Sequence, residues 1–168
     1  MNQRTAITGS VVHFLLAPAL VAGVIPFYLT SWRFEQYSIA AIIAGGIPIA
    51  AGTLVLLACF WLFVRDGRGT PAPIAPTERL VVRGPYRCVR NPMYLSVIGI
   101  IAGQAVIFWQ INLLLYGAGA GLVMATFARV YEEPSLCAAF GTEYDEYRLH
   151  VPAWLPRWQA WHGASRGR

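Results

Sequence analysis

The sequence predicts an all-α fold: an integral membrane helical bundle of about four transmembrane helices, with a cytoplasmic amphipathic helix near the C-terminus. Its 168 residues are 57% hydrophobic and only 12% charged, about half the charged share of a soluble domain. Several apolar runs are long enough to cross a hydrocarbon core of ~30 Å. All thirteen basic side chains are arginines, and they lie between and beyond these runs. We therefore expect one integral membrane domain over residues 1–168.

Residues 1–64 are expected to form two spans. The first runs from about Thr8 to Leu29, and the second from about Tyr37 to Val64. Both contain prolines, which bend a membrane helix where neighbouring helices can satisfy the freed backbone groups. A short connection with aromatic side chains suited to the headgroup region joins the two spans.

Residues 65–168 are expected to form a cytoplasmic loop, a helical hairpin and a C-terminal segment. The third span begins at Pro92, which fits the first turn of a helix because no N–H is needed there, and ends at about Phe108. A tight turn at Trp109–Asn112 leads into the fourth span, from Leu113 to about Val130. Because the turn is short, these two spans must be antiparallel neighbours.

The arginines predict the orientation. Twelve of the thirteen fall on one side of the four-span arrangement, and only Arg33 falls on the other. The positive-inside rule places the arginine-rich side, with both termini, in the cytoplasm of a multi-pass cell (inner) membrane protein. The net charge of +5 reflects this topology and contact with phosphates, and no long basic patch indicates nucleic acid. Cys59, Cys88 and Cys137 lack metal-ligand spacing, so we expect free thiols in a reducing compartment and no metal site.

An amphipathic pattern follows the last span. Its apolar positions recur at steps of three and four residues, at Leu136, Phe140, Tyr144 and Tyr147. This spacing predicts a helix on the cytoplasmic face, which Gly141 could interrupt. The tail after it, residues 151–158, mixes tryptophan, proline and arginine, as an interfacial anchor does.

The segment Arg83–Tyr94 is basic, aromatic and broken by prolines, and it separates long apolar runs. Its arginines enter lipid only at high cost, so it must lie at a membrane face. Pro85 and Pro92 stop helices and bias the residues before them toward extended geometry. The segment is either an interfacial anchor or part of a site, and its tyrosines and prolines favour a site.

Two polar clusters are expected to meet at the cytoplasmic end of the hairpin. One is the loop Glu78–Tyr94, and the other comprises Arg129, Glu132 and Glu133. They could form a salt-bridge cluster that fixes helix register. Alternatively, they form a pocket with a polar mouth and an apolar wall, for a charged cofactor and a lipid-like partner.

Two motif blocks carry a resemblance to a known family. The first reads Gly84-Pro85-Tyr86-x-x-x-Arg90-Asn91-Pro92-x-Tyr94. The second reads Glu132-Glu133-x-x-Leu136-x-x-x-Phe140-Gly141-x-x-Tyr144-x-x-Tyr147-x-x-x-Val151-Pro152. In this order and spacing they closely resemble the isoprenylcysteine carboxyl methyltransferase family, and the related phospholipid N-methyltransferases share part of the pattern. The resemblance covers roughly Glu78 to Arg157.

The resemblance implies methyl transfer from S-adenosyl-L-methionine without a Rossmann domain, with S-adenosyl-L-homocysteine as product. By motif position, the implied cofactor contacts are Glu78, Arg79, Leu80, Val81, Tyr86, Arg90, Asn91, Pro92, Met93, Tyr94 and Glu132. An arginine before the paired glutamates contacts substrate in the family, and the candidate is Arg129, one residue off the family register. Asn91 stands where eukaryotic members carry histidine, and asparagine cannot titrate.

The chemistry of these residues fits such roles. Glu132 can pair with a positive group of the cofactor, and an arginine or backbone N–H groups can hold its carboxylate. A carboxylate acceptor of the prenylcysteine type needs no general base, and Arg129 could bind it in a bidentate pair. A lipid amine would need deprotonation, for which Glu133 is the candidate. The remaining hypotheses are a non-catalytic lipid scaffold or sensor and another membrane enzyme, such as a lipid reductase.

Overall fold

The computed structural model describes residues 16–31, 33–34, 38–66 and 80–162, and every regular element in these ranges is helical. The N-terminal helical segment Leu16–Thr30 contains a π-helix, η1 (Leu20–Val24), followed by α2 (Ile25–Thr30). The remaining elements are α3 (Ile39–Asp66), the 3₁₀ turn η2 (Gly84–Arg87), α4 (Pro92–Phe108), α5 (Ile111–Phe127), the π-helix η3 (Ala128–Glu132), α6 (Glu133–Phe140) and α7 (Thr142–His150).

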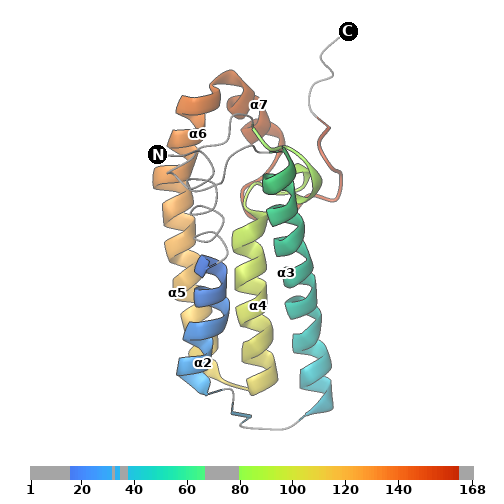
Figure 1. The fold of residues 1–168 in the computed structure, drawn as a ribbon, viewed down its shortest axis with the longest axis vertical. Coiled ribbons are helices and arrows are strands. Elements are labelled where there is room, and N and C mark those ends of the chain that lie inside the picture. Colours follow the sequence, from blue (N-terminus) through green and yellow to red (C-terminus); the bar gives the residue numbers. More distant parts are fainter. Residues whose placement is uncertain (1–15, 32, 35–37, 67–79, 163–168) are drawn as a thin grey trace.

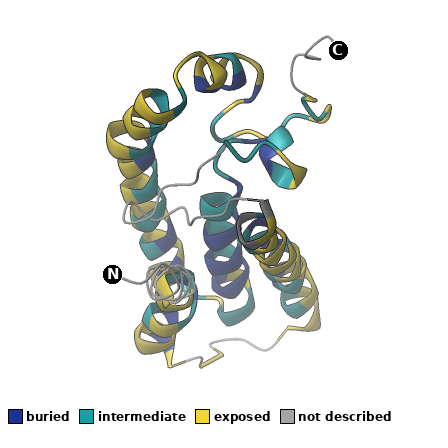
Figure 2. Cartoon of the chain, turned by 45° about the horizontal axis from the view of Figure 1, so that its top comes forward, coloured by how far each residue is buried: buried dark blue, intermediate teal, exposed yellow. Residues whose placement is uncertain are grey.

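The long helices run side by side, and α4 is the central one (Figure 1). α4 packs against α3, α5 and η1. Buried residues therefore gather on α4, which contributes eight of them (Figure 2). α6 continues from α5 beyond the end of the bundle where α4 begins, and α7 turns over that end. The all-helical fold class is confirmed over the described ranges.

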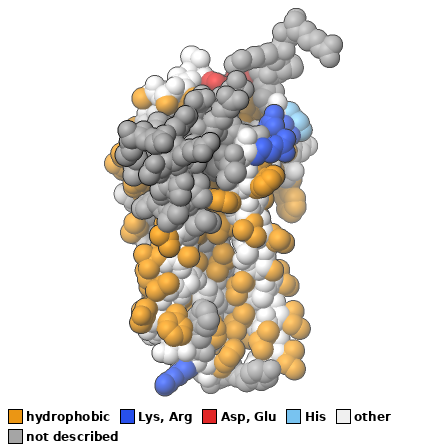
Figure 3. Space-filling view, in the orientation of Figure 1, with side chains coloured by type: hydrophobic (Ala, Val, Ile, Leu, Met, Phe, Trp, Pro, Cys, Tyr) orange, Lys and Arg blue, Asp and Glu red, His pale blue; other side chains and the backbone are white. Residues whose placement is uncertain are grey.

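The outer surface of the bundle is apolar. The helical segments Ile39–Leu62 and Ile111–Phe140 are long and apolar enough to cross a membrane, with only 6% and 17% of their apolar windows buried within the molecule. Their hydrophobic side chains therefore face outward, where lipid can cover them (Figure 3). The apolar helices Leu16–Thr30 and Pro92–Phe108 are shorter, so a count of four spans stays a prediction.

α3 and α4 approach each other through glycine. A Cβ atom at Gly45 would collide with the carbonyl oxygen of Gly103, and one at Gly103 would collide with that of Gly45. One register further along, a Cβ at Gly52 would lie 2.8 Å from the carbonyl oxygen of Ser96. Small residues allow membrane helices to pack backbone against backbone in this way.

Two polar side chains satisfy carbonyl groups in the π-helix η1. Gln104 on α4 donates from Nε2 to the carbonyl oxygen of Ala22 at 2.6 Å. Tyr116 on α5 donates its hydroxyl to the carbonyl oxygen of Val21 at 2.8 Å. A π-helix disturbs the regular backbone ladder, so hydrogen-bond partners from neighbouring helices help to satisfy its carbonyl groups.

Two predicted helix boundaries change. Trp109 adopts a left-handed conformation with φ of 55° and ends α4, so α5 begins at Ile111 and the turn is shorter than predicted. The helix that contains the predicted last span continues past the predicted end at about Val130 and reaches Phe140. The π-helix η3 widens this helix just before Pro134, where a proline ring would otherwise break it.

The interruption at Gly141 is confirmed. This glycine has φ of 53° and separates α6 from α7, a conformation that costs a residue without a Cβ atom little. The predicted starts of the first two spans, Thr8 and Tyr37, lie outside the described residues.

Candidate functional site

The two polar clusters meet at the end of the bundle where α4 begins. Tyr94, in the first turn of α4, donates its hydroxyl to Glu132 Oε1 at 2.6 Å. Arg90, just before α4, pairs through Nη1 with Glu133 Oε1 at 2.7 Å. The adjacency expected from an antiparallel hairpin is therefore confirmed.

Arg90 is held from two sides, and its Nε has no partner in the described part of the chain. Its Nη1 also donates to the Tyr144 hydroxyl at 3.2 Å, and 13% of its side chain is exposed. Its Nε is buried without an acceptor among the described residues, and so is Nε of Arg87. A buried N–H group without a partner is costly, so these two donors could bind an anionic group.

A cluster of aromatic side chains supports the loop from beneath. Tyr144, Tyr147 and Val151 are buried against Leu80, Val82, Leu136, Cys137, Phe140 and Trp161. Tyr147 donates its hydroxyl to the carbonyl oxygen of Tyr86 at 2.7 Å. Burial raises the pKa of Tyr147 above its ordinary value, so this hydroxyl stays protonated and remains a donor at neutral pH.

Tyr86 is part of this packing. It is buried, and burial together with the neighbouring Cys59 thiol raises its pKa well above the ordinary value. Its side chain forms a hydrogen bond with the Cys59 side chain of α3. This contact fixes η2 against the end of that helix. The structure therefore places Tyr86 among protein side chains, whereas Tyr94 lies beside the paired glutamates.

The C-terminal segment is bound to the motif loop by main-chain hydrogen bonds. Arg90 N donates to Pro152 O at 2.9 Å, and Asn91 donates to Ala153 O through its backbone N at 3.3 Å and its side-chain Nδ2 at 3.2 Å. Further along, Arg157 N donates to Cys88 O and Trp161 N to Arg87 O, both at 3.0 Å. We refer to residues 151–161 as the C-terminal strap.

The strap makes protein contacts that the prediction of an interfacial anchor did not include. Val151 is fully buried, and Trp161 packs on Tyr147 and His150, so much of the segment contacts protein. Only part of it projects, as Trp158 does. Main-chain pairing between two irregular segments leaves no periodic pattern, and sequence reasoning therefore missed it.

The other predicted site residues fall into three groups. The first group is apolar: Leu80, Val81 and Met93 are half-buried, and Pro92 is buried. Arg129 on η3 is exposed and bonds to no described side chain, so it does not join the cluster around Glu132. Glu78 and Arg79 lie outside the described residues.

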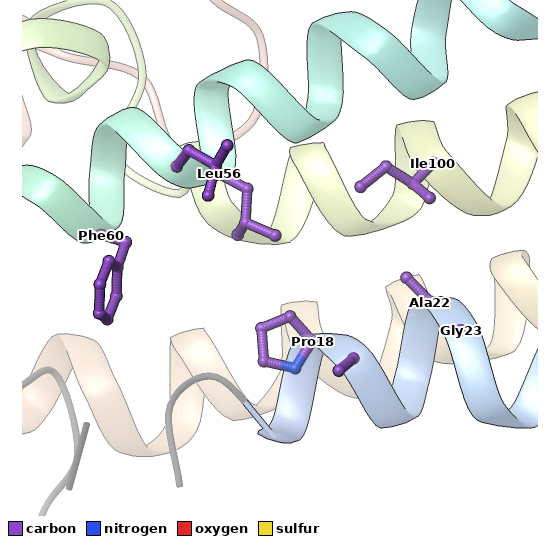
Figure 4. Close-up of a pocket in the computed structure, with 8 residues that line it drawn as sticks. Pro18, Ala22, Gly23, Leu56, Phe60 and Ile100 are labelled. Carbon is purple, nitrogen blue, oxygen red and sulfur yellow. The ribbon is translucent and has the colours of Figure 1, made fainter. Parts of the chain in front are cut away.

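An apolar cavity of about 280 Å³ lies deeper in the bundle, between the N-terminal helix, α3 and α4 (Figure 4). It is lined by Pro18, Ala19, Ala22, Gly23, Leu56, Leu57, Phe60 and Ile100. Ile100 is six residues beyond Tyr94, or about 9 Å along an α-helix. A hydrocarbon chain could therefore occupy the cavity below the polar cluster.

A polar cluster at one end of a bundle with an apolar outer surface is the layout expected of a membrane protein. Residues 40–143, well over half of the chain, match the model of the phospholipid methyltransferase family. The chain therefore belongs to this family of membrane methyltransferases. Among curated proteins and among solved structures, nothing matches the chain. The narrower resemblance to isoprenylcysteine carboxyl methyltransferases stays a prediction.

Proposed function

We propose that the protein transfers a methyl group from S-adenosyl-L-methionine to a lipid-like acceptor at the membrane face. The observation that carries this proposal is the Tyr94–Glu132 pair, in which the motif loop and the glutamate pair come within 2.6 Å. Membership of a methyltransferase family favours a binding role for this pair over the alternative that it only fixes the register of the helices.

The residues present fit the cofactor. Its sulfonium and ammonium groups are positive, and Glu132 offers a half-buried carboxylate beside the Tyr94 ring. Its carboxylate is negative, and the Nε groups of Arg87 and Arg90, which have no acceptor within the described part of the chain, offer buried donors for it. When bound, the cofactor would supply an activated methyl group. The protein would bind both reactants, align the acceptor with the methyl group and exclude water. These effects account for most of the rate enhancement in such a displacement.

The leading acceptor is a carboxylate of the prenylcysteine type. Glu133, the candidate general base, is engaged by Arg90 at 2.7 Å, so a nucleophile that needs no deprotonation fits the site better. Arg129 is an exposed arginine three residues before Glu132 and could bind such a carboxylate. The apolar cavity between the N-terminal helix, α3 and α4 suits the hydrocarbon part of the acceptor.

A lipid amine is the second candidate, and the phospholipid methyltransferase match favours it. The two acceptors leave chemically different products. A methyl ester releases its methyl group as methanol in alkali, whereas an N-methyl group survives. Incubation with methyl-labelled cofactor and either a prenylcysteine analogue or a phosphatidylethanolamine therefore separates them.

We expect purified protein in detergent to bind S-adenosyl-L-homocysteine in isothermal titration calorimetry, and Glu132→Gln to abolish the binding heat. The substitution removes the negative charge and keeps the side-chain size, so the protein should still insert and elute as a single species. Glu143→Gln is the matched control, because Glu143 is exposed on α7. Absence of binding by the wild type would refute the cofactor claim. Unchanged binding by Glu132→Gln would favour a lipid scaffold.

A further inference from the structure

The C-terminal strap places one aromatic side chain beside the Tyr94–Glu132 pair. Ala153 accepts two hydrogen bonds from Asn91, one from its backbone N and one from Nδ2. The next residue is Trp154, so its backbone position is fixed relative to the start of α4. Its ring is stacked on that of Tyr94, with centroids 6.3 Å apart and an interplanar angle of 20°.

This arrangement gathers two aromatic rings and a carboxylate. The Tyr94 hydroxyl is held by Glu132 at 2.6 Å, which fixes the Tyr94 ring on which Trp154 stacks. An aromatic face attracts a cation through its quadrupole, and tryptophan does so more strongly than tyrosine or phenylalanine. Trp154 is half-buried, so part of its surface is available to a ligand.

The other strap tryptophans differ from Trp154. Trp158 is fully exposed, and Trp161 packs on Tyr147 and His150 at centroid distances of 5.8 and 5.4 Å. Of the three, Trp154 is the one that stacks on a residue of the polar cluster. It also lies beyond the family match, which ends at residue 143.

We propose that Trp154 is a further cofactor-binding residue, whose aromatic face receives the positively charged part of S-adenosyl-L-methionine beside Glu132, and that Asn91 is the positioning residue that holds it there. The inference rests on the proposed function and extends it to the strap. It also gives the Asn91 side chain a role that needs no titration, since its amide N–H donates to Ala153 O without any change of charge.

The test compares the sulfonium cofactor with its neutral thioether product. Trp154→Ala is expected to weaken binding of S-adenosyl-L-methionine about tenfold, the range of a cation–π contact shielded from water. Binding of S-adenosyl-L-homocysteine should weaken much less, because its sulfur carries no charge. Trp154→Phe should retain most of the affinity, and Trp158→Ala is the control on the same strap. Thermal unfolding identifies any variant that fails to fold.

Asn91 is tested with the same pair of ligands. Asn91→Asp replaces the donor by an acceptor facing the Ala153 carbonyl, so it should reproduce the selective loss of S-adenosyl-L-methionine binding. Asn91→His should keep the wild-type affinity for S-adenosyl-L-methionine, because a ring N–H can donate in place of the amide N–H.

The outcomes separate the two proposals. If the wild type binds both ligands and Trp154→Ala binds them as the wild type does, the role of Trp154 is refuted and the proposed function stands. If Trp154→Ala loses affinity for both ligands equally, the role of Trp154 is also refuted, because a merely structural residue would behave in that way. If the wild type binds neither ligand, the proposed function fails and the role of Trp154 fails with it.

Discussion

Glu132 and Glu133 are neighbours in the chain but have different partners. Glu132 accepts a hydrogen bond from a neutral phenol, Tyr94 at 2.6 Å, whereas Glu133 pairs with a guanidinium, Arg90 at 2.7 Å. A carboxylate paired with a fixed cation is already neutralised. One that faces a phenol is not neutralised by its partner. The same residue type therefore serves two purposes at adjacent positions.

This difference predicts separable effects of substitution. Glu133→Gln should lower the free energy of unfolding by about 1.5 kcal/mol, the lower range for a hydrogen bond to a charged group, because Arg90 loses its ion-pair partner. Binding of S-adenosyl-L-homocysteine should stay within about threefold of wild type, in contrast to the loss expected for Glu132→Gln. Denaturant titration and calorimetry measure the two quantities. Full stability with lost binding would instead place Glu133 at the cofactor.

At the scale of the helices, the site depends on how closely α3 and α4 pack. η2 rests against the end of α3 through Tyr86 and Cys59, and Tyr94 belongs to the first turn of α4. A shift between these helices would therefore move the motif loop. The backbone contact at Gly45 and Gly103 limits that shift.

We predict that Gly45→Ala destabilises the bundle and Gly46→Ala does not. The new Cβ at Gly45 would meet the Gly103 carbonyl and the Ile107 side chain, whereas the one at Gly46 has nothing within 4 Å. Overpacking of this kind costs about 1–3 kcal/mol, while alanine in place of glycine slightly favours the helix. Thermal unfolding in detergent compares the adjacent variants. Equal melting temperatures would contradict the close approach.

The sequence predicted the elements that have a period or a sharp boundary. Pro92 marked the start of α4 and Gly141 marked the break between α6 and α7, because each imposes a backbone conformation by itself. The hairpin of α4 and α5 followed from its short turn and brought Tyr94 to Glu132. The strap could not be predicted from the sequence, because hydrogen bonds such as Arg157 N to Cys88 O involve backbone groups that every residue carries.

At the scale of the whole molecule, charge and apolar surface are separated along the bundle. On the face that Figure 3 shows, hydrophobic side chains extend along the bundle and the described charged side chains lie near its ends. The polar cluster, Arg129 and the strap lie at one end, and Arg33 and the α4–α5 turn lie at the other. An enzyme with this layout can take a water-soluble cofactor from one side while its acceptor stays in the bilayer.

The arginine distribution predicts which end faces the cytoplasm. In the predicted four-span arrangement, twelve of the thirteen arginines fall on the side of the polar cluster, and translocating that side would move many charges across the membrane. In a variant whose three native cysteines are replaced, a cysteine at the exposed position Asn112 should react with an impermeant maleimide in intact cells. One at the exposed position Ala138 should react only after lysis, and both should react in detergent. The reverse pattern would place the cluster outside, away from the cytoplasmic cofactor, and labelling of both positions in intact cells would contradict a bundle that spans the membrane.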